Sequence, residues 1–122
     1  MAQILISEPN ADVRALFEHM VRRLGHKPLA LWAVTAERAA TIDLLVIEPA
    51  DPRSRELAAQ VRIVAPALPI LAVSIMPPNS AELTPANGYL LKPVVLDELR
   101  IAIDSLLAAA PADSSLPSLQ PA

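Results

Sequence analysis

Apolar residues are distributed along the chain in two alternating patterns, short unbroken runs and longer stretches with a helical period. The short runs contain mostly Ile, Leu and Val, as in Leu44-Leu45-Val46-Ile47. Such runs are typical of buried strands in parallel sheets. We therefore predict strands at residues 3–7, 29–33, 43–48, 70–74 and 88–91.

Helices are predicted between these strands. Asn10 is a suitable N-cap for a first helix that ends at Gly25, and the side chains expected to face the core are Val13, Leu16, Phe17, Met20, Val21 and Leu24. A short helix is expected over residues 35–41, and a longer one over 55–65 with Leu57, Val61 and Val64 inward. The last helix spans residues 96–109, and its buried side should carry Leu99, Ile103, Leu106 and Leu107.

Strands and helices alternate throughout residues 1–110, which we interpret as one domain. This order predicts an α/β fold, a five-stranded parallel sheet with helices on both faces and right-handed crossovers. Residues 111–122 are rich in Pro and Ser and have no period, so we expect them to form a disordered tail.

The composition excludes several classes of function. The 122 residues carry a net charge of −3 without a cluster of Lys and Arg, which argues against nucleic-acid binding. The absence of cysteine excludes a disulfide framework and a thiolate metal site. No apolar stretch approaches the roughly 20 residues of a membrane span, and the first strand begins too near Met1 to leave room for a signal peptide. We expect a cytoplasmic domain that binds neither membrane nor nucleic acid.

Polar side chains stand at the ends of four predicted strands and should meet at the carboxyl edge of the sheet, where open α/β folds keep their sites. These residues are Glu8, Glu48, Ser74 and Lys92. Glu48 is the most informative of them, because a carboxylate directly after a buried aliphatic run is costly without a partner. We expect Glu48 to reach Lys92, and Ser74 lies where it can join them.

Several segments, in order and spacing, resemble the receiver domain of bacterial two-component response regulators, the CheY-like family. The strongest match is Gly88-Tyr89-Leu90-Leu91-Lys92-Pro93, followed by Leu96-Asp97-Glu98-Leu99, which is similar to the family's fifth strand, its Lys-Pro pair and the start of its last helix. Residues 44–48 resemble the strand that presents the phosphorylated aspartate, and residues 68–74 the strand that ends in the switch hydroxyl. The resemblance covers about residues 3–109. It implies a doubly wound, flavodoxin-like fold with shortened second and fourth helices.

The resemblance also implies a degenerate phosphorylation site. In family receivers an aspartate accepts a phosphoryl group, and Mg²⁺ is held by that aspartate and by two adjacent acids after the first strand. Here Glu48 stands at the acceptor position, and Glu8 and Pro9 stand at the two acids. Because Mg²⁺ demands nearly ideal octahedral oxygen geometry, Glu8 and Glu48 are only weak ligand candidates, and we expect neither metal nor another cofactor. The remaining matches are Lys92 for the family's lysine, Ser74 for its switch hydroxyl and Tyr89 for its switch aromatic.

These matches predict a pseudo-receiver, a stand-alone signalling domain that is not an enzyme and acts by protein–protein interaction. Its partner would be a histidine kinase or another regulator. The sequence leaves open whether the domain also forms a homodimer. Glu48 either forms a plain structural ion pair with Lys92 or imitates a phosphorylated aspartate and fixes one conformation. Two alternatives remain: a phosphorylatable response regulator with an atypical site, and a receiver-like domain that binds a small ligand in its altered crevice.

Other polar and aromatic residues are predicted to have no part in the site. His19 and His26 have no carboxylate constellation around them and are expected at the surface. Trp32 is expected to pack at the sheet edge or in the core. Asp51 is expected to serve as a turn residue.

Overall fold

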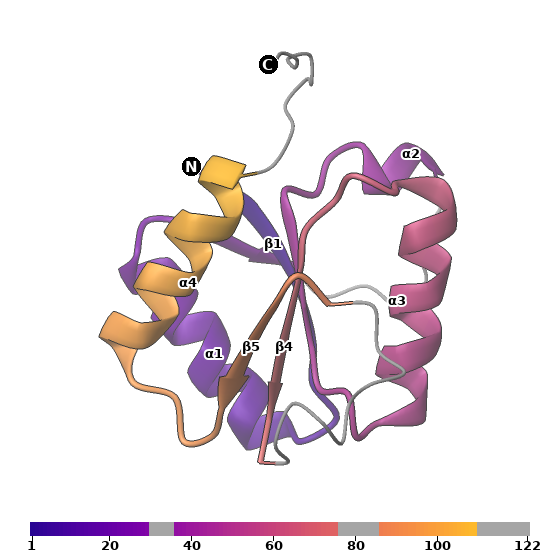
Figure 1. Ribbon diagram of the computed structural model, residues 1–122. Coiled ribbons are helices and arrows are strands. Elements are labelled where there is room, and N and C mark those ends of the chain that lie inside the picture. Colours follow the sequence, from indigo (N-terminus) through magenta and orange to yellow (C-terminus); the bar gives the residue numbers. More distant parts are fainter. Residues whose placement is uncertain (30–35, 76–85, 110–122) are drawn as a thin grey trace.

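A computed structural model describes residues 1–29, 36–75 and 86–109 (Figure 1). The elements follow one another as β1 (Gln3–Ser7), α1 (Ala11–Arg23), β2 (Lys27–Leu29), α2 (Ala36–Ala39), β3 (Leu44–Ile47), α3 (Pro52–Val64), β4 (Ile70–Ser74), β5 (Gly88–Leu91) and α4 (Leu96–Ala109). All strand pairs are parallel, and the strands of the five-stranded sheet lie in the order β2-β1-β3-β4-β5. The predicted doubly wound, flavodoxin-like α/β fold is confirmed.

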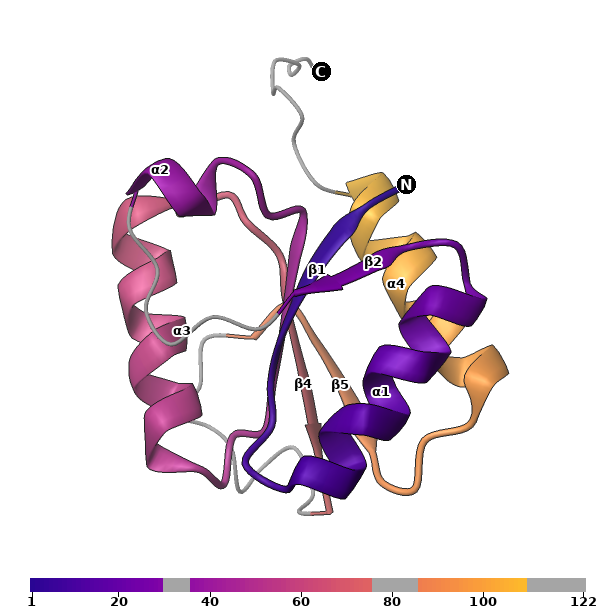
Figure 2. The same cartoon turned by 180° about the vertical axis from the view of Figure 1, so that it is seen from behind.

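Helices cover both faces of the sheet: α1 and α4 lie together on one side, and α2 and α3 on the other (Figures 1 and 2). Successive side chains of a strand point to opposite faces. Ile4 and Ile6 of β1 therefore belong to the apolar layer under α1 and α4, and Leu5 to the layer under α2 and α3. The inner strands β3 and β4 are buried on both sides, which explains their long runs of apolar residues.

The first helix forms where the sequence predicts it. The Oδ1 atom of Asn10 accepts hydrogen bonds from the N–H groups of Asp12 at 2.9 Å and Val13 at 3.0 Å. At the other end Gly25 has a φ of 87°, a conformation that favours glycine over residues with a Cβ atom. The expectation that Leu16 faces the core is wrong, because this side chain is 52 % exposed.

Two elements start two or three residues before the predicted position. The second strand starts at Lys27 and not at residue 29, because the N–H of Lys27 pairs with the carbonyl of Ala2 at 2.8 Å and Lys27 is in register with Gln3; residues 30–33 of the predicted strand lie outside the described residues. Helix α3 begins at Pro52 rather than at residue 55, since a proline at the first helical position needs no N–H partner. Val64, predicted to point inward, is 38 % exposed, and Ala58 is buried instead.

Some expectations fall outside the described residues. Trp32, the region between β4 and β5 at 76–85 where the family's fourth helix would lie, and the tail at 111–122 belong to them. The label α4 therefore denotes the last helix of the described chain. In the described ranges, no helix is both long and apolar enough to span a membrane.

Candidate functional site

The carboxyl edge of the sheet brings Glu8, Glu48 and Lys92 into direct contact. Glu8 follows β1 and Glu48 follows β3, which are neighbours in the sheet, and Lys92 follows β5. The Nζ atom of Lys92 lies 2.8 Å from Oε1 of Glu8 and 2.7 Å from Oε1 of Glu48. The lysine side chain is 17 % exposed, and the two carboxylates are 4 % and 9 % exposed. One ammonium group thus serves two buried carboxylates.

The second oxygen of each carboxylate is also engaged. Oε2 of Glu8 accepts a hydrogen bond from the N–H of Asn10 at 3.1 Å, and Oε2 of Glu48 accepts one from the N–H of Ala50 at 2.9 Å. Each glutamate therefore closes the turn that follows it and binds Lys92 at the same time. Buried charges need such partners, because a carboxylate without them loses its hydration uncompensated.

The ionisation of this cluster follows from its contacts. Burial alone would raise the pKa of Glu48, but the hydrogen bonds from Lys92, from the N–H of Ala50 and from Ser74 outweigh it and hold this pKa below its usual value. Burial likewise disfavours the charged form of Lys92, yet its hydrogen bonds to Glu48 and Glu8 raise its pKa above the usual value. Both groups are therefore charged at neutral pH.

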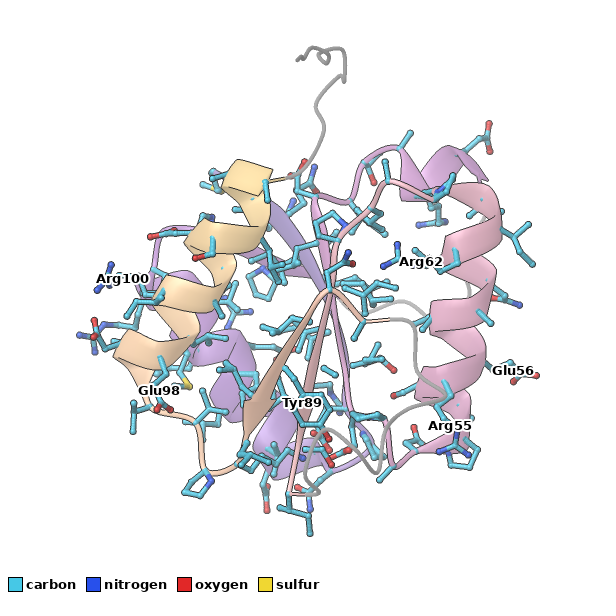
Figure 3. The ribbon with its side chains drawn as sticks, in the orientation of Figure 1. Arg55, Glu56, Arg62, Tyr89, Glu98 and Arg100 are labelled. Atoms are coloured by element: carbon cyan, nitrogen blue, oxygen red, sulfur yellow. The ribbon has the colours of Figure 1, made fainter. Side chains whose placement is uncertain are left out.

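Ser74 and Tyr89, which match the family's switch residues, have different surroundings in the structure. Ser74 is fully buried at the end of β4, and its side chain is hydrogen-bonded to Glu48. Tyr89 is half-buried on β5 and packs against the apolar cluster on the α3 side of the sheet. Figure 3 shows this ring near the carboxyl edge. The structure thus joins Glu8, Glu48, Ser74 and Lys92 in one cluster. Tyr89 lies outside this cluster, against the apolar layer between the sheet and α3.

Sequence reasoning missed Ser54, a buried serine of α3 that is hydrogen-bonded to Ser7, the residue before Glu8. Ser54 is fully buried, its Oγ lies 2.8 Å from Oγ of Ser7, and it donates to the carbonyl of Ser7 at 3.2 Å. Its hydroxyl also lies 3.3 Å from Oδ2 of Asp51, the N-cap residue of α3. The Asp51-Pro52 pair was a usable signal, because Pro is favoured at the first position of a helix, and that start turns Ser54 toward the sheet.

Two arginines hold the loops that carry the glutamates. Nη1 of Arg14, from α1, donates to the carbonyl of Glu8 at 3.1 Å. Nη1 of Arg55, from α3, donates to the carbonyl of Pro49 at 2.7 Å. Hydrogen bonds from charged donors are stronger than neutral ones. The loops after β1 and β3 are therefore fixed from the flanking helices as well as by their own carboxylates.

The carboxylate oxygens that could ligate a divalent cation are bound to other groups of the protein. The ammonium of Lys92 lies against one oxygen of each carboxylate, and Pro9 offers no side-chain oxygen. Among the described residues, no group of three or more His, Cys, Asp or Glu side chains is placed to hold a metal ion. Mg²⁺ in proteins usually keeps several waters and takes one or two carboxylates, whereas here each carboxylate gives one oxygen to Lys92 and the other to a backbone N–H.

We accordingly expect weak Mg²⁺ binding, with a dissociation constant no lower than about tens of millimolar, an order of magnitude that follows from the small number of ligands. Titration with MgCl₂ followed by the amide signals of Asn10 and Ala50 measures it, since both N–H groups bind the glutamates. NaCl at the same ionic strength is the control. Saturation near one millimolar Mg²⁺ would contradict the expectation.

Comparison with solved structures identifies the class of fold. The chain is similar to a response regulator receiver domain protein from Clostridium thermocellum, at 18 % identity and a TM-score of 0.77 over 88 % of this chain and 95 % of that one. It is also similar to the receiver domain of the sensor histidine kinase PA1611 from Pseudomonas aeruginosa, whose structure has a magnesium ion coordinated in the active site cleft, at 19 % identity and a TM-score of 0.73 over 88 % and 98 % of the two chains.

A two-component response regulator from Clostridium difficile is a further neighbour, at 20 % identity and a TM-score of 0.71 over 89 % and 98 % of the two chains. No protein-family model and no curated protein sequence matches the chain. At these identities the likeness concerns the fold. The chain therefore has the fold of response regulator receiver domains.

Proposed function

We propose that the chain is a pseudo-receiver, a signalling domain that acts by binding another protein and does not take part in phosphoryl transfer. The observation that carries the proposal is the position of Lys92, whose ammonium group is bound by Glu48 at 2.7 Å and by Glu8 at 2.8 Å. Glu48 occupies the position at which the resemblance to receivers places the phosphoacceptor. Its carboxylate is already bound on both oxygens.

In-line phosphoryl transfer depends on the position of the attacking oxygen and on neutralisation of the phosphate charge. Glu48 has one methylene more than aspartate, which displaces its carboxylate by roughly 1.5 Å, the length of a C–C bond. Pro9 removes one of the acids that hold Mg²⁺ in family receivers. Both requirements are therefore weakened at once. The receiver domain of the kinase PA1611, by contrast, holds magnesium in its cleft.

Glu48 also reproduces one result of phosphorylation. Its carboxylate is an anion bound to Lys92 and to the buried hydroxyl of Ser74, the two groups that the family directs at a phosphoryl group. We propose that this contact keeps the domain in one conformation, which a histidine kinase or another regulator would recognise. The signal passed to the partner would then depend on the concentration of this domain and not on a phosphate donor.

The expected result of incubation with Mg²⁺ and acetyl phosphate is an unchanged intact mass. The matched variant is Pro9→Asp combined with Glu48→Asp, which returns an acid beside Glu8 and a short acceptor at position 48. This variant should gain a phosphoryl group at position 48 in the presence of Mg²⁺ and not with EDTA. Mass spectrometry of both proteins after the same incubation checks the prediction.

Phosphorylation of the unmodified chain on Glu48 or Ser74 would instead support the alternative of a phosphorylatable regulator with an atypical site. The Pro9→Asp variant, which retains Glu48, separates the two changes. It should stay unphosphorylated, because the acceptor oxygen and the Lys92 contact are unaltered in it.

A further inference from the structure

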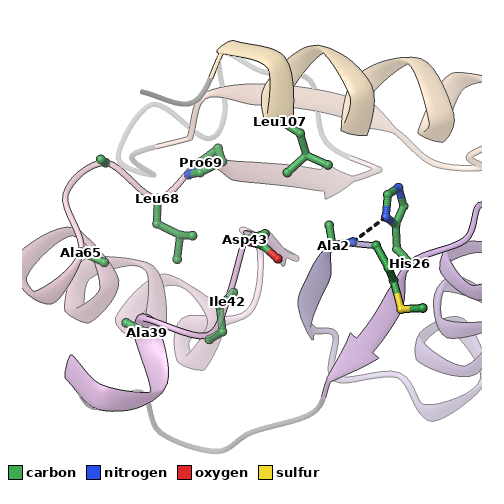
Figure 4. Close-up of a pocket in the computed structure, with 11 residues that line it drawn as sticks. Ala2, His26, Ala39, Ile42, Asp43, Ala65, Leu68, Pro69 and Leu107 are labelled. Atoms are coloured by element: carbon green, nitrogen blue, oxygen red, sulfur yellow. Dashed lines mark hydrogen bonds between the residues drawn. The ribbon is translucent and has the colours of Figure 1, made fainter. Parts of the chain in front are cut away.

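A concave region lies at the amino edge of the sheet, the end remote from the glutamates (Figure 4). Several of its residues directly precede strands, as Ala2, Asp43 and Pro69 do. Its volume is about 620 Å³, and most of its lining is apolar, with Ala39, Ile42, Leu68 and Leu107 among the side chains. We call this region the amino-edge pocket.

A guanidinium group holds the loop that supplies Ala67, Leu68 and Pro69 to the amino-edge pocket. Arg62 donates from Nη1 to the carbonyls of Pro66 at 3.2 Å and Leu68 at 2.6 Å, and from Nη2 to Oδ1 of Asn87. The same Asn87 oxygen accepts a hydrogen bond from the N–H of Ile70 at 2.8 Å. The loop from α3 to β4 is thus tied to β5, and a pocket that exists before binding costs less to fill than one that must be ordered.

One polar donor borders the apolar lining. Nδ1 of His26 accepts a hydrogen bond from the N–H of Ala2 at 3.0 Å, so in the neutral ring the proton resides on Nε2. In residues 1–29, 36–75 and 86–109, no hydrogen bond involves Nε2 of His26. The pocket therefore offers an N–H donor for an acceptor at its rim. His26 was predicted at the surface, whereas it is half-buried.

The chain contains a segment of matching chemistry that begins at the wall of the pocket. Leu107 lines the pocket, α4 ends at Ala109, and residues 110–122 follow. This segment has no Lys or Arg and contains Leu116-Pro117-Ser118-Leu119. Polyproline II has three residues per turn, so leucines three positions apart share one face of it. The only charged side chain of the segment is Asp113.

We propose that residues 112–119 bind in the amino-edge pocket of the same molecule. In this arrangement Leu116 and Leu119 pack against the apolar lining, and the carboxylate of Asp113 accepts a hydrogen bond from Nε2 of His26. Ala109 and Leu116 are seven residues apart, and a linker of this length with random-coil statistics has a root-mean-square span of about 15 Å. A tether of that length keeps the segment at an effective concentration of about a millimolar, which favours it over a free competitor.

A spin label tests the proposal on the full chain. The sequence has no cysteine, so Ser118→Cys gives one attachment site for a nitroxide. We expect loss of amide signal intensity at Ala2, Ile42 and Ala67 around the pocket and unchanged intensity at Asn10 and Ala50 at the opposite edge. Equal intensities at both edges would overturn the proposal.

Matched variants make the result specific. Ala67→Glu places a charge on an exposed residue of the pocket and should restore the signals of Ala2 and Ile42, whereas Ala59→Glu, on an exposed position of α3, should not. Leu116→Ser with Leu119→Ser should also restore them. Signal loss in a mixture of isotope-labelled chain without nitroxide and unlabelled chain with it would show binding between molecules, and would overturn the intramolecular proposal in favour of a second copy.

Discussion

Replacement of Lys92 by methionine is expected to lower the free energy of unfolding by about 3–5 kcal/mol, because it leaves two buried carboxylates without their cation. The exposed fractions of 4 % for Glu8 and 9 % for Glu48 leave little room for water to take the place of the ammonium group. Urea denaturation followed by circular dichroism measures the change. Lys27, the other lysine of the chain, is exposed on β2, so Lys27→Met is the matched control and should change stability by less than about 0.5 kcal/mol.

A double-mutant cycle isolates the contact itself. Glu48→Gln should be less destabilising than Lys92→Met, because the amide oxygen can still accept a hydrogen bond from Lys92 and Glu8 retains its charge. The double variant should lose less than the sum of the single losses, since groups in contact are not independent. Strictly additive losses would show that Glu48 and Lys92 are not paired in solution.

The second large effect is a change in the direction of the pH dependence. In the unmodified chain the pKa of Glu48 is below its ordinary value of 4.5. Its contribution to stability is therefore fully present above that value and is lost as pH falls through the folded-state pKa. The pKa of Lys92 is above its ordinary value of 10.5, so its contribution is present below that value and is lost as pH rises through the folded-state pKa. The contribution of the Glu48–Lys92 pair to stability should therefore be constant between these limits.

In Lys92→Met the free energy of unfolding should depend on pH between 7 and 5, a range in which the pair makes a constant contribution in the unmodified chain. Without the ammonium group, burial and the neighbouring carboxylate of Glu8 act together and raise the pKa of Glu48. A raised carboxylate pKa means that the folded state binds the proton more tightly than the unfolded state, so stability should increase as pH falls from 7 toward 5. Urea midpoints at several pH values measure the slope. A stability of Lys92→Met that stays constant or falls between pH 7 and pH 5 would mean that the two glutamates do not interact when Lys92 is absent.

The fold could be predicted from the sequence because its inner strands are buried on both faces. Runs such as Leu44–Ile47 have no other simple interpretation, and their alternation with helical periods defines a parallel sheet. The start of the edge strand β2 was predicted two residues too late for a physical reason. Its described part, Lys27–Leu29, contains Pro28 and is only partly buried, so its register depends on pairing with β1 and not on its own apolar pattern.

The residues of the candidate site could be predicted from the sequence, but their contacts could be predicted only in part. The ends of parallel strands share one edge, which brings Glu48 and Lys92 together in any such fold. The ion pair between Glu8 and Lys92 depends on the path of the loop after β1. Asn10 and Arg14 fix this path through hydrogen bonds with Glu8. Ser54 was missed because a buried hydroxyl in a helix gives no signal until the start of that helix is known.

The two turns that Glu8 and Glu48 close have an evolutionary consequence. Each side chain is long enough to reach both the N–H two residues further on and the shared ammonium of Lys92. A descendant that shortened Glu48 alone would lose a contact of this buried cluster without gaining a metal ligand at Pro9. One that changed Pro9 alone would add a negative charge beside two others. Each single step toward a phosphoacceptor therefore passes through a less stable protein, so the present site resists reversal by single substitutions.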